Sequence, residues 1–216
     1  MAGLDKVFLP LGGTPLIFYC LKVFETAAEI DDVILVLSES SVDRGEELIR
    51  HEGLVKASRV VAGGPRRQDS VANGLRILAD CDIVIIHDGA RPLVDCDLIS
   101  RALDAVAETG AASAAVPVKD TIKVAGPDRI VTETPDRRTL WAAQTPQIFR
   151  TDLLRDAHQR VTHDVTDDAS MVESIGARIK LFMGAYENLK VTMPEDVALA
   201  ESILAARIDA RVHGAP

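Results

Sequence analysis

The stretch that decides the fold is Cys81-Asp-Ile-Val-Ile-Ile-His-Asp-Gly-Ala-Arg-Pro92. Its run from Asp82 to Ile86 is apolar and rich in β-branched residues, and it stops at a polar loop. This pattern predicts a buried parallel strand that leads into the loop. Because ligands of open α/β sheets bind outside the carboxyl ends of the strands, Asp88 and Arg91 are candidate ligand groups. The alternative is a capped turn in which Asp88 and Arg91 satisfy each other.

The rest of the strand and helix pattern fits the same architecture. Apolar runs at 33–37, 60–62, 111–116 and 178–183 predict further strands, and amphipathic segments at 41–50, 71–78, 95–109, 151–160, 166–173 and from Pro194 predict helices. Another helix is expected to start at Pro15 with Thr14 as N-cap. Right-handed crossovers place helices on both faces, so we expect an α/β fold with a mostly parallel, doubly wound sheet.

Length and composition indicate one domain over residues 1–216. The chain is 47% hydrophobic, which is enough for a full core, and no apolar run reaches the roughly 18 residues of a membrane span. The start of the chain lacks a signal-peptide pattern. Cys20, Cys81 and Cys96 have no metal-ligand spacing, so we expect buried thiols in a reducing compartment. The expected location is the cytoplasm, with no membrane partner.

The charge of the chain argues against one class of partner and favours another. A net charge of −9 and a pI near 5.0 exclude a general nucleic-acid binder. Cations nevertheless gather in the predicted loops, at Lys6, Arg66, Arg67, Arg91, Lys119, Lys123, Arg137, Arg138 and Lys190. A local cationic site on an acidic protein indicates a small polyanionic ligand.

The segment Gly63-Gly64-Pro65-Arg66-Arg67-Gln68-Asp69-Ser70 lies between a predicted strand and a predicted helix. Glycines there let the backbone approach a ligand, and the helix N-terminus offers N–H groups to an anion or to the polar edge of a base. Two glycines at a loop are more often only a turn, so both interpretations stay open.

The pattern changes at about 119–138. Residues 120–124 and 130–134 alternate in polarity around Ala125-Gly-Pro-Asp-Arg129, which is a hairpin signature. A two-stranded ribbon with few large apolar residues is marginal alone. We therefore expect a protruding β-arm that packs against a second subunit and makes a homodimer. The alternative is an excursion that lies over its own domain.

Short motifs add a resemblance to a known family. They are Asp-Lys-Val-Phe-Leu-Pro-Leu-Gly-Gly, Gly-Gly-x-x-Arg-x-x-Ser-Val, His-Asp-Gly-Ala-Arg-Pro, Pro-Val-x-Asp-Thr-Ile-Lys, Asp-Arg-x-x-Leu-Trp-x-x-Gln-Thr-Pro-Gln-x-Phe, Thr-Asp-Asp-Ala-Ser and Asn-x-Lys-Val-Thr-x-Pro-Glu-Asp, and they run from Lys6 to Asp196. In this order they resemble the 2-C-methyl-D-erythritol 4-phosphate cytidylyltransferases of the non-mevalonate isoprenoid pathway. The resemblance implies a Rossmann-like nucleotidyltransferase fold and a Mg²⁺-dependent transfer of CMP from CTP to the substrate phosphate.

The resemblance also implies roles for residues of the nucleotide site. Lys6 matches the family lysine that stabilises the transition state, although alone it would be interpreted as a solvated surface lysine. The cytidine-binding segment is matched by Gly63, Gly64 and Ser70, while nothing is carried onto the variable position of Pro65. Residues lining the nucleotide and sugar-phosphate site are matched by Asp88 and Arg91, and Asp88 could orient a hydroxyl or help to hold the metal. His87 is expected to be a structural, hydrogen-bonded turn residue.

The substrate site is matched by a second set. Thr145, Thr166 and Lys190 match the wall around the methylerythritol phosphate, and Lys190 is also expected to be catalytic; the alternative for it is a solvated lysine. Arg137, which is also expected to be catalytic, matches the arginine that reaches the sugar phosphate across the dimer interface, with Thr121 nearby on the same arm. A fork-shaped guanidinium suits a phosphate dianion.

One departure from the family concerns the beginning of the chain. The family starts with a buried strand and a loop of the form Ala-Ala-Gly-x-Gly-x-Arg, whereas this sequence opens with Met1-Ala-Gly-Leu-Asp-Lys6, where the family is leaving that loop. We expect a true start upstream of Met1. Otherwise a central strand is missing, apolar edges are exposed and CTP binding is weak.

Two other functions compete with this expectation. One is transfer of CMP to ribitol 5-phosphate or to another polyol phosphate, which would use the same fold and most of the nucleotide site. The other is an inactive, truncated homologue that only dimerises or binds substrate.

Overall fold

The structure is a computed structural model that describes residues 6–212 and 214. The expectation about Met1 concerns residues 1–5, which lie outside this range. In chain order the elements are η1 (Lys6–Phe8), β1 (Pro10–Leu11), β2 (Thr14–Pro15), α1 (Leu16–Thr26), β3 (Ile34–Leu37), η2 (Glu39–Ser41), α2 (Val42–Glu52), β4 (Arg59–Ala62), α3 (Arg67–Ile77), β5 (Ile83–Ile86), α4 (Cys96–Thr109), β6 (Ala111–Pro117), β7 (Val124–Ala125), β8 (Val131–Glu133), η3 (Arg137–Thr139), β9 (Trp141–Arg150), α5 (Thr151–Arg160), α6 (Asp168–Ser174), β10 (Lys180–Met183) and α7 (Pro194–Val212).

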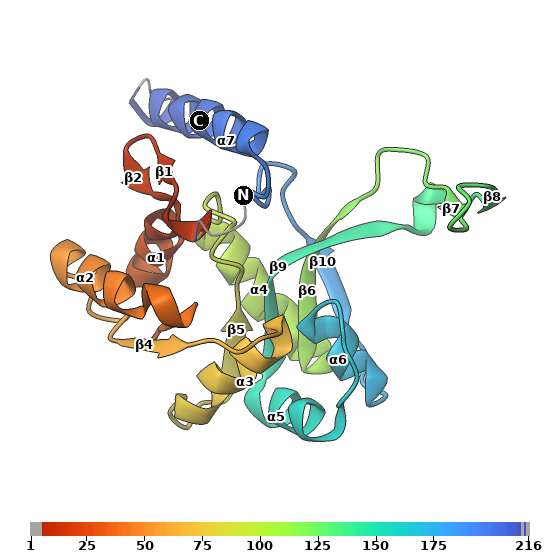
Figure 1. Cartoon of the computed structure of the whole chain (residues 1–216), viewed down its shortest axis with the longest axis horizontal. Helices are drawn as coiled ribbons and strands as arrows, with labels where there is room; N and C mark the ends of the chain where they lie inside the picture. Colours follow the sequence, from red (N-terminus) through yellow and green to blue (C-terminus); the bar gives the residue numbers. More distant parts are fainter. Residues whose placement is uncertain (1–5, 213, 215–216) are drawn as a thin grey trace.

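The central sheet has four strands in the order β10-β6-β9-β5 (Figure 1). Strands β10 and β6 are parallel, whereas β9 runs antiparallel to both of its neighbours. Strands β3 and β4 form a separate parallel pair. The sheet is therefore mixed, since one antiparallel strand lies among strands that share a direction.

Helices cover both faces of this sheet, which confirms the α/β fold. Because successive side chains of a strand point to opposite faces, Ile83 and Ile85 of β5 pack with α1 and α4, while Val84 and Ile86 pack with α3, α5 and α6. The alanines of β6 alternate in the same way, and six of its seven residues are buried. Small residues in this central strand let helices on both faces approach the sheet closely.

The longest strand, β9, was not predicted from the sequence. It contains Pro146 and two glutamines, Gln144 and Gln147, and a proline argues against a central strand. The structure accommodates Pro146 in a bulge, where the pairing shifts so that residues 144–146 lie opposite Ala114 alone. Such bulges re-aim side chains beside functional sites, and this one contains Thr145.

Strand β5 corrects the first expectation. It was predicted as a buried parallel strand, but all four residues are only partly buried and its single partner, β9, is antiparallel. Within residues 6–212 and 214, β5 and β3 each pair with a strand on one side only. One edge of each strand is left without a strand partner, which accounts for the partial exposure of β5.

Capping confirms some helix limits and corrects others. Helix α4 begins after Asp95, whose carboxylate accepts a hydrogen bond from the Leu98 N–H, and ends at Gly110 with a positive φ of 79°, as predicted. Helix α1 begins one residue later than expected, with Pro15 at the N-cap, because Thr14 and Pro15 pair with β1.

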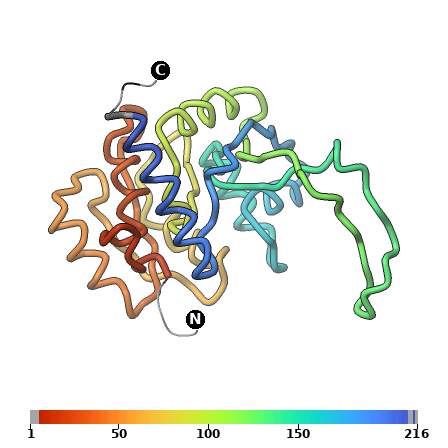
Figure 2. Tube along the Cα trace, turned by 90° about the horizontal axis from the view of Figure 1, so that it is seen from above, coloured from red at the N-terminus to blue at the C-terminus, as the bar shows by residue number. Residues whose placement is uncertain are grey.

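Two peripheral segments frame the molecule. Helix α7 packs its Ala200 against Leu11 and Leu16 in the β1–α1 region, and the two lie side by side in both views (Figures 1 and 2). At the other end, β7 and β8 pair as an antiparallel hairpin that projects away from the sheet. The hairpin predicted over 120–134 therefore forms, with shorter strands than expected. No helix among residues 6–212 is long and apolar enough to cross a membrane.

The cysteines are free thiols, but their burial differs from the prediction. Cys20 is buried, Cys81 is partly buried and Cys96 is exposed. Cys96 is exposed because it is the first residue of α4, and its thiol lies 4.0 Å from the Thr26 hydroxyl.

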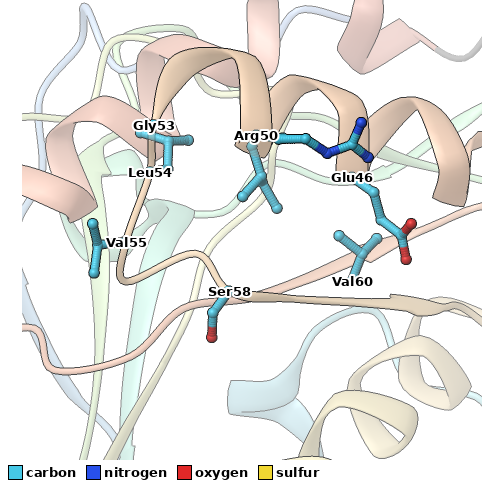
Figure 3. Close-up of a pocket in the computed structure, with 8 residues that line it drawn as sticks. Glu46, Arg50, Gly53, Leu54, Val55, Ser58 and Val60 are labelled. Carbon is cyan, nitrogen blue, oxygen red and sulfur yellow. The ribbon is translucent and has the colours of Figure 1, made fainter.

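A shallow hollow of about 390 Å³ lies between the end of α2 and β4 (Figure 3). It is lined by Glu46, Ile49, Arg50, Gly53, Leu54, Val55, Ser58 and Val60. None of the residues predicted for a ligand site lines it, and its one acidic and one basic side chain give no excess of positive charge. The hollow is therefore not the polyanion site that the sequence predicts.

Candidate functional site

Three cations surround the carboxylate of Asp88, which follows β5. The Lys190 Nζ lies 2.9 Å from Asp88 Oδ2, the Arg67 Nε lies 3.5 Å from Oδ1, and the Arg91 Nε lies 3.7 Å from Oδ2. The three come from different parts of the chain: the start of α3, the loop after β5 and the segment before α7. The structure thus brings the carboxyl end of β5 together with the start of α3 and with Lys190, which is about one hundred positions away in the sequence.

The electrostatics of this cluster favour an ionised Asp88 and an excess of positive charge. Burial alone would raise the pKa of the Asp88 carboxyl, but the hydrogen bond from Lys190 and the charges of Lys190, Arg67 and Arg91 outweigh it and hold that pKa below its usual value. Burial lowers the pKa of Arg91, although Asp88 opposes this effect. Even when Asp168, which pairs with Arg67, is counted, three cations face two carboxylates, and this leaves positive charge for an anion.

Arg91 is held from several directions. Its Nη1 donates to the Asn188 carbonyl at 2.7 Å, and its backbone N–H donates to the Asp88 carbonyl. Its Nε is buried and has no aligned hydrogen-bond acceptor among the described residues. The contact between Asp88 and Arg91 that one sequence interpretation predicted is therefore present, and both residues also belong to the cationic cluster.

Thr145, in the bulge of β9, fixes the loop that follows β5. Its hydroxyl accepts the Asp88 N–H at 3.0 Å and lies 3.2 Å from His87 Nδ1. Since His87 Nε2 lies 3.1 Å from the Arg91 carbonyl, which can only accept, Nε2 carries the proton and Nδ1 accepts from Thr145. Burial lowers the pKa of His87 to about 4. This neutral, fully engaged imidazole fits the structural role expected for His87.

The Gly63–Ser70 turn after β4 is closed by Ser70. The Gly64 N–H donates to the Ser70 hydroxyl at 3.1 Å, and that hydroxyl lies 3.2 Å from the Arg66 carbonyl. A Cβ at Gly63 would lie 2.6 Å from Ser70 Oγ, and one at Gly64 would lie 2.4 Å from the Cβ of Asp69. Both glycines are therefore required by close approach within the turn itself.

Thr166 lies in a loop that is tied to the start of α3. The Gln68 side chain accepts the Val165 N–H at 3.2 Å and donates to the His163 carbonyl. The Thr166 hydroxyl is 3.4 Å from that of Ser170, and Asp167, not Thr166, caps α6. Thr166 is thus placed close to the turn that carries Arg67.

Lys6 lies in η1 and contacts the segment that carries Lys190. Its ammonium group donates to the Thr192 carbonyl at 3.3 Å and is exposed. Thr192 is two residues from Lys190, so the two predicted lysines border the same segment.

Two predicted residues lie outside this group. Arg137 is exposed in η3 at the base of the arm, where its Nη1 donates to the Lys119 carbonyl at 2.8 Å. Thr121, two residues after Lys119 on the same arm, is also exposed. The arm projects away from the sheet (Figure 1), and no contact joins either residue to the Asp88 cluster among the residues that the structure describes.

Sequence reasoning gave no specific role to three members of the site, although it counted Arg67 among the cations of the predicted loops. Arg67 and Asp168 form an ion pair of 2.7 Å behind Asp88, and the buried amide of Asn188 donates to the Thr145 carbonyl at 2.8 Å. All three lie inside motifs that the sequence displays, so the signal was present. No role was given to them because their partners are distant in the sequence.

The α/β fold, with a cation-rich cluster after β4 and β5, is of the class whose ligands bind at the carboxyl ends of the strands. The sequence model of the 2-C-methyl-D-erythritol 4-phosphate cytidylyltransferase family matches residues 1–206. The chain belongs to this family.

Individual relatives agree with this assignment. The chain is 45% identical over 204 residues to the 2-C-methyl-D-erythritol 4-phosphate cytidylyltransferase of Dehalococcoides mccartyi, covering 94% of this chain and 90% of that protein. It is 41% identical over 210 residues to the Alkaliphilus metalliredigens enzyme of the same name, covering 95% of this chain and 87% of the relative.

Solved structures give the same result. The 4-diphosphocytidyl-2C-methyl-D-erythritol synthase of Anaerococcus prevotii superposes with a TM-score of 0.85 at 29% identity, over 92% of this chain and 93% of that one. The Thermus thermophilus 2-C-methyl-D-erythritol 4-phosphate cytidylyltransferase superposes with a TM-score of 0.78 at 34% identity, over 92% of each chain.

Proposed function

We propose that the protein transfers CMP from CTP to 2-C-methyl-D-erythritol 4-phosphate, giving 4-diphosphocytidyl-2-C-methyl-D-erythritol and pyrophosphate in isoprenoid precursor biosynthesis. Family membership supports this reaction. The observation that carries it in the structure is the Asp88 cluster, where Lys190, Arg67 and Arg91 converge on one carboxylate. Such a site suits two phosphorylated substrates that must lie close together.

The reaction needs positioning and charge neutralisation more than proton transfer. A phosphate oxygen of the acceptor forms a bond to the α-phosphorus of CTP, and the bond from that phosphorus to the β-phosphate bridging oxygen breaks, which releases pyrophosphate. The attacking phosphate is already ionised, so no general base is required. Lys190, and Lys6, which contacts Thr192 two residues further on, are proposed to stabilise the negative charge that develops on the phosphoryl oxygens.

The remaining residues are proposed to bind the substrates. The Gly63–Gly64 turn and Ser70 would hold the cytidine, whose polar base edge can use backbone groups at a turn of this kind. Asp88 would orient a hydroxyl of the nucleotide, and Arg91 would face the phosphates. The methylerythritol phosphate would then lie between Thr145, Thr166 and Lys190.

A Mg²⁺ ion fits the donor set at Asp88. Mg²⁺ in nucleotide enzymes is held by one or two carboxylates together with substrate phosphates, and Asp88 is an ionised carboxylate that remains partly accessible, at 16% of its side chain. The described residues contain no cluster of three or more acidic, histidine or cysteine ligands, so the nucleotide would supply the other ligands. When bound, the ion would neutralise charge on the phosphoryl oxygens.

The arm is proposed to complete the site across a homodimer. Ile122, Val124, Ile130 and Val131 are all exposed on the arm, with Ile130 at 64%. A ribbon of this composition is not expected to hold its shape in isolation. A second copy of the chain would cover these side chains and would receive Arg137 and Thr121 next to its methylerythritol phosphate. This arrangement accounts for the position of both residues outside the Asp88 cluster.

Hybrid dimers test the role of the arm. Arg137→Ala and Lys190→Ala should each abolish most activity, but mixing the two variants after reversible dissociation should restore activity, because each hybrid dimer contains one intact site. The activity of a mixture of Arg137→Ala homodimers with wild-type homodimers is the reference value for the recovery. No recovery in dimers shown by co-purification of two different subunit tags to have exchanged subunits would place Arg137 in its own subunit's site.

Domain organisation and location complete the proposal. We propose that residues 1–216 form one nucleotidyltransferase domain with the arm as an insertion at about 119–138. The cytoplasm, where nucleotides and reduced thiols coexist, is the proposed compartment.

The choice of acceptor tests the proposed reaction. Pyrophosphate release from CTP with Mg²⁺ should require 2-C-methyl-D-erythritol 4-phosphate, and ribitol 5-phosphate should support it at least about a hundredfold more slowly, since the hydrogen-bonded wall is specific for one polyol. Faster turnover of ribitol 5-phosphate would assign the other polyol substrate. If the folded protein released no pyrophosphate with either acceptor, the result would support the inactive homologue.

A further inference from the structure

A buried carboxylate lies behind the Asp88 cluster. Asp168, the first residue of α6, is fully buried, and the Arg67 Nη1 lies 2.7 Å from its Oδ2. Neither oxygen has an aligned hydrogen-bond donor within the described part of the chain. The His158 Nε2 lies 3.9 Å from Oδ1, but burial lowers the pKa of this histidine, so it is not a counter-charge at neutral pH. Burial raises the pKa of the Asp168 carboxyl, and the charge and close contact of Arg67 oppose this rise. The ionised form of Asp168 is costly to bury without a counter-charge, so it depends on Arg67.

Arg67 connects this carboxylate to Asp88. Its Nη1 faces Asp168, while its Nε lies 3.5 Å from Asp88 Oδ1. Burial alone would lower the pKa of Arg67, but the two carboxylates outweigh burial and raise that pKa. The guanidinium group is planar and rigid, so fixing one edge also fixes the direction of the other.

The backbone around this pair is firmly placed. Asp167 caps α6 by accepting the Ser170 N–H at 2.8 Å, and the Gln147 side chain joins Asp167 at 2.7 Å and the Ala169 N–H at 3.1 Å. These bonds hold the first turn of α6 against β9. Asp168 is consequently a fixed anchor, unlike the partly exposed groups that face the substrate.

The neighbouring arginine provides a contrast. Arg66 pairs with Asp69 and with Asp164, whose side chain is 83% exposed, and its contacts remain at the surface. Exposed pairs of this kind contribute little. Of the two consecutive arginines, only Arg67 links a buried anion to the site.

We infer that Asp168 is a positioning residue for the cytidylyl transfer: it holds one edge of Arg67, so that Arg67 holds the Asp88 carboxylate in the orientation that the substrates require. This inference rests on the proposed function. It assigns a use to Arg67 and to the second aspartate of the Thr-Asp-Asp-Ala-Ser motif, neither of which the proposed reaction otherwise employs.

The kinetic test uses Asp168→Asn, which removes the charge but keeps the size of the side chain. Its kcat should fall by about 10- to 100-fold, as for other groups that orient an active-site residue. The same substitution should have no further effect when Arg67 is already Gln, because the two residues act as one unit. The matched control, Asp164→Asn beside Arg66, should retain the wild-type kcat. An unchanged kcat in Asp168→Asn, or fully additive losses, would overturn the inference.

A second variant covers the case in which Asp168→Asn fails to fold. Arg67→Lys keeps a counter-charge for Asp168 but lacks the planar fork, so it should unfold within a few degrees of the wild-type protein while its kcat falls. Wild-type kcat in Arg67→Lys would contradict the inference.

A structural readout separates this inference from the proposed function. Crystal structures of the wild-type protein and the folded variant should show the cation at position 67 or the Asp88 carboxylate displaced relative to the wild type. Unchanged positions would overturn the positioning role even if the wild-type protein is active. Conversely, a wild-type protein that fails to transfer CMP would contradict the proposed function, and the displacement would still decide the link between Asp168 and Asp88.

Discussion

Strands β6 and β5 belong to the same sheet but are built very differently. Strand β6 has partners on both sides, β10 and β9, and six of its seven residues are buried. Strand β5 pairs only with β9 in the described part of the chain, and each of its four residues is partly exposed. The separate β3–β4 pair resembles β5, because β3 also has a strand partner on one side only.

This difference shows where stability and chemistry lie in the molecule. The Asp88 cluster and the Gly63–Ser70 turn follow β5 and β4, which are on the less buried side. The groups that fix them come mainly from the well-packed side: Thr145 from β9 and Asp168 from α6. The site is therefore a set of loops on partly exposed strands that are held in place by a rigid half.

Hydrogen exchange should show the largest contrast. Amides of β6 should exchange only on global unfolding, whereas amides of β3 and β5 that point away from β4 and β9 should exchange through local opening. The difference in opening free energy should reach about 5 kcal/mol, since local openings cost far less than global unfolding. Mass spectrometry of peptides from both regions measures it. Equal protection in the two regions would mean that the free edges of β3 and β5 are covered to the same degree as β6.

A pair of isoleucines tests the same contrast within one layer. Ile148 of β9 and Ile85 of β5 are direct cross-strand partners, and both pack into the cluster with α1 and α4. Ile148 is completely buried, so Ile148→Ala should reduce the free energy of unfolding by about 2–5 kcal/mol. Ile85→Ala should cost roughly half as much, because less area returns to water. Urea titrations of both variants measure the two losses of unfolding free energy, and equal losses would contradict the contrast between β9 and β5.

The sequence predicted some features of these two regions and missed others. Asp95 and Gly110 marked both ends of α4 because capping is a local property. Strand β9 was missed because Pro146 and two glutamines hide its pattern, and its bulge depends on pairing with β6. The exposure of β5 could not be predicted either, since an apolar run has the same composition whether or not a neighbouring strand covers it.

Prediction of the site from the sequence was limited in the same way. Asp88 and Arg91 are close in the sequence, and their contact was foreseen as one alternative. The pairing of Lys190 with Asp88 and of Asp168 with Arg67 depends on the fold bringing distant segments together. Motif resemblance pointed to these positions, but only the structure showed their partners.

Acid should weaken the β5 side through His87. Its pKa is lowered from 6.5 to about 4 by burial, so between these values the unfolded chain binds a proton that the folded protein does not. The free energy of unfolding should therefore fall as the pH decreases from 6.5 to 4, by up to about 3 kcal/mol. Urea titrations across this range should show a flatter profile for His87→Gln, which is less stable at pH 7. Identical slopes would rule out His87 as the source.

The central claim is that this chain joins CMP to a polyol phosphate. ³¹P NMR of the protein with CTP, Mg²⁺ and 2-C-methyl-D-erythritol 4-phosphate tests it most directly, because the spectrum identifies every phosphorus product. We predict loss of CTP and acceptor with equal formation of pyrophosphate and a new diphosphate diester, and loss of this reaction in Lys190→Ala. Unchanged substrates, or CDP or CMP formed without the diester, would contradict the account.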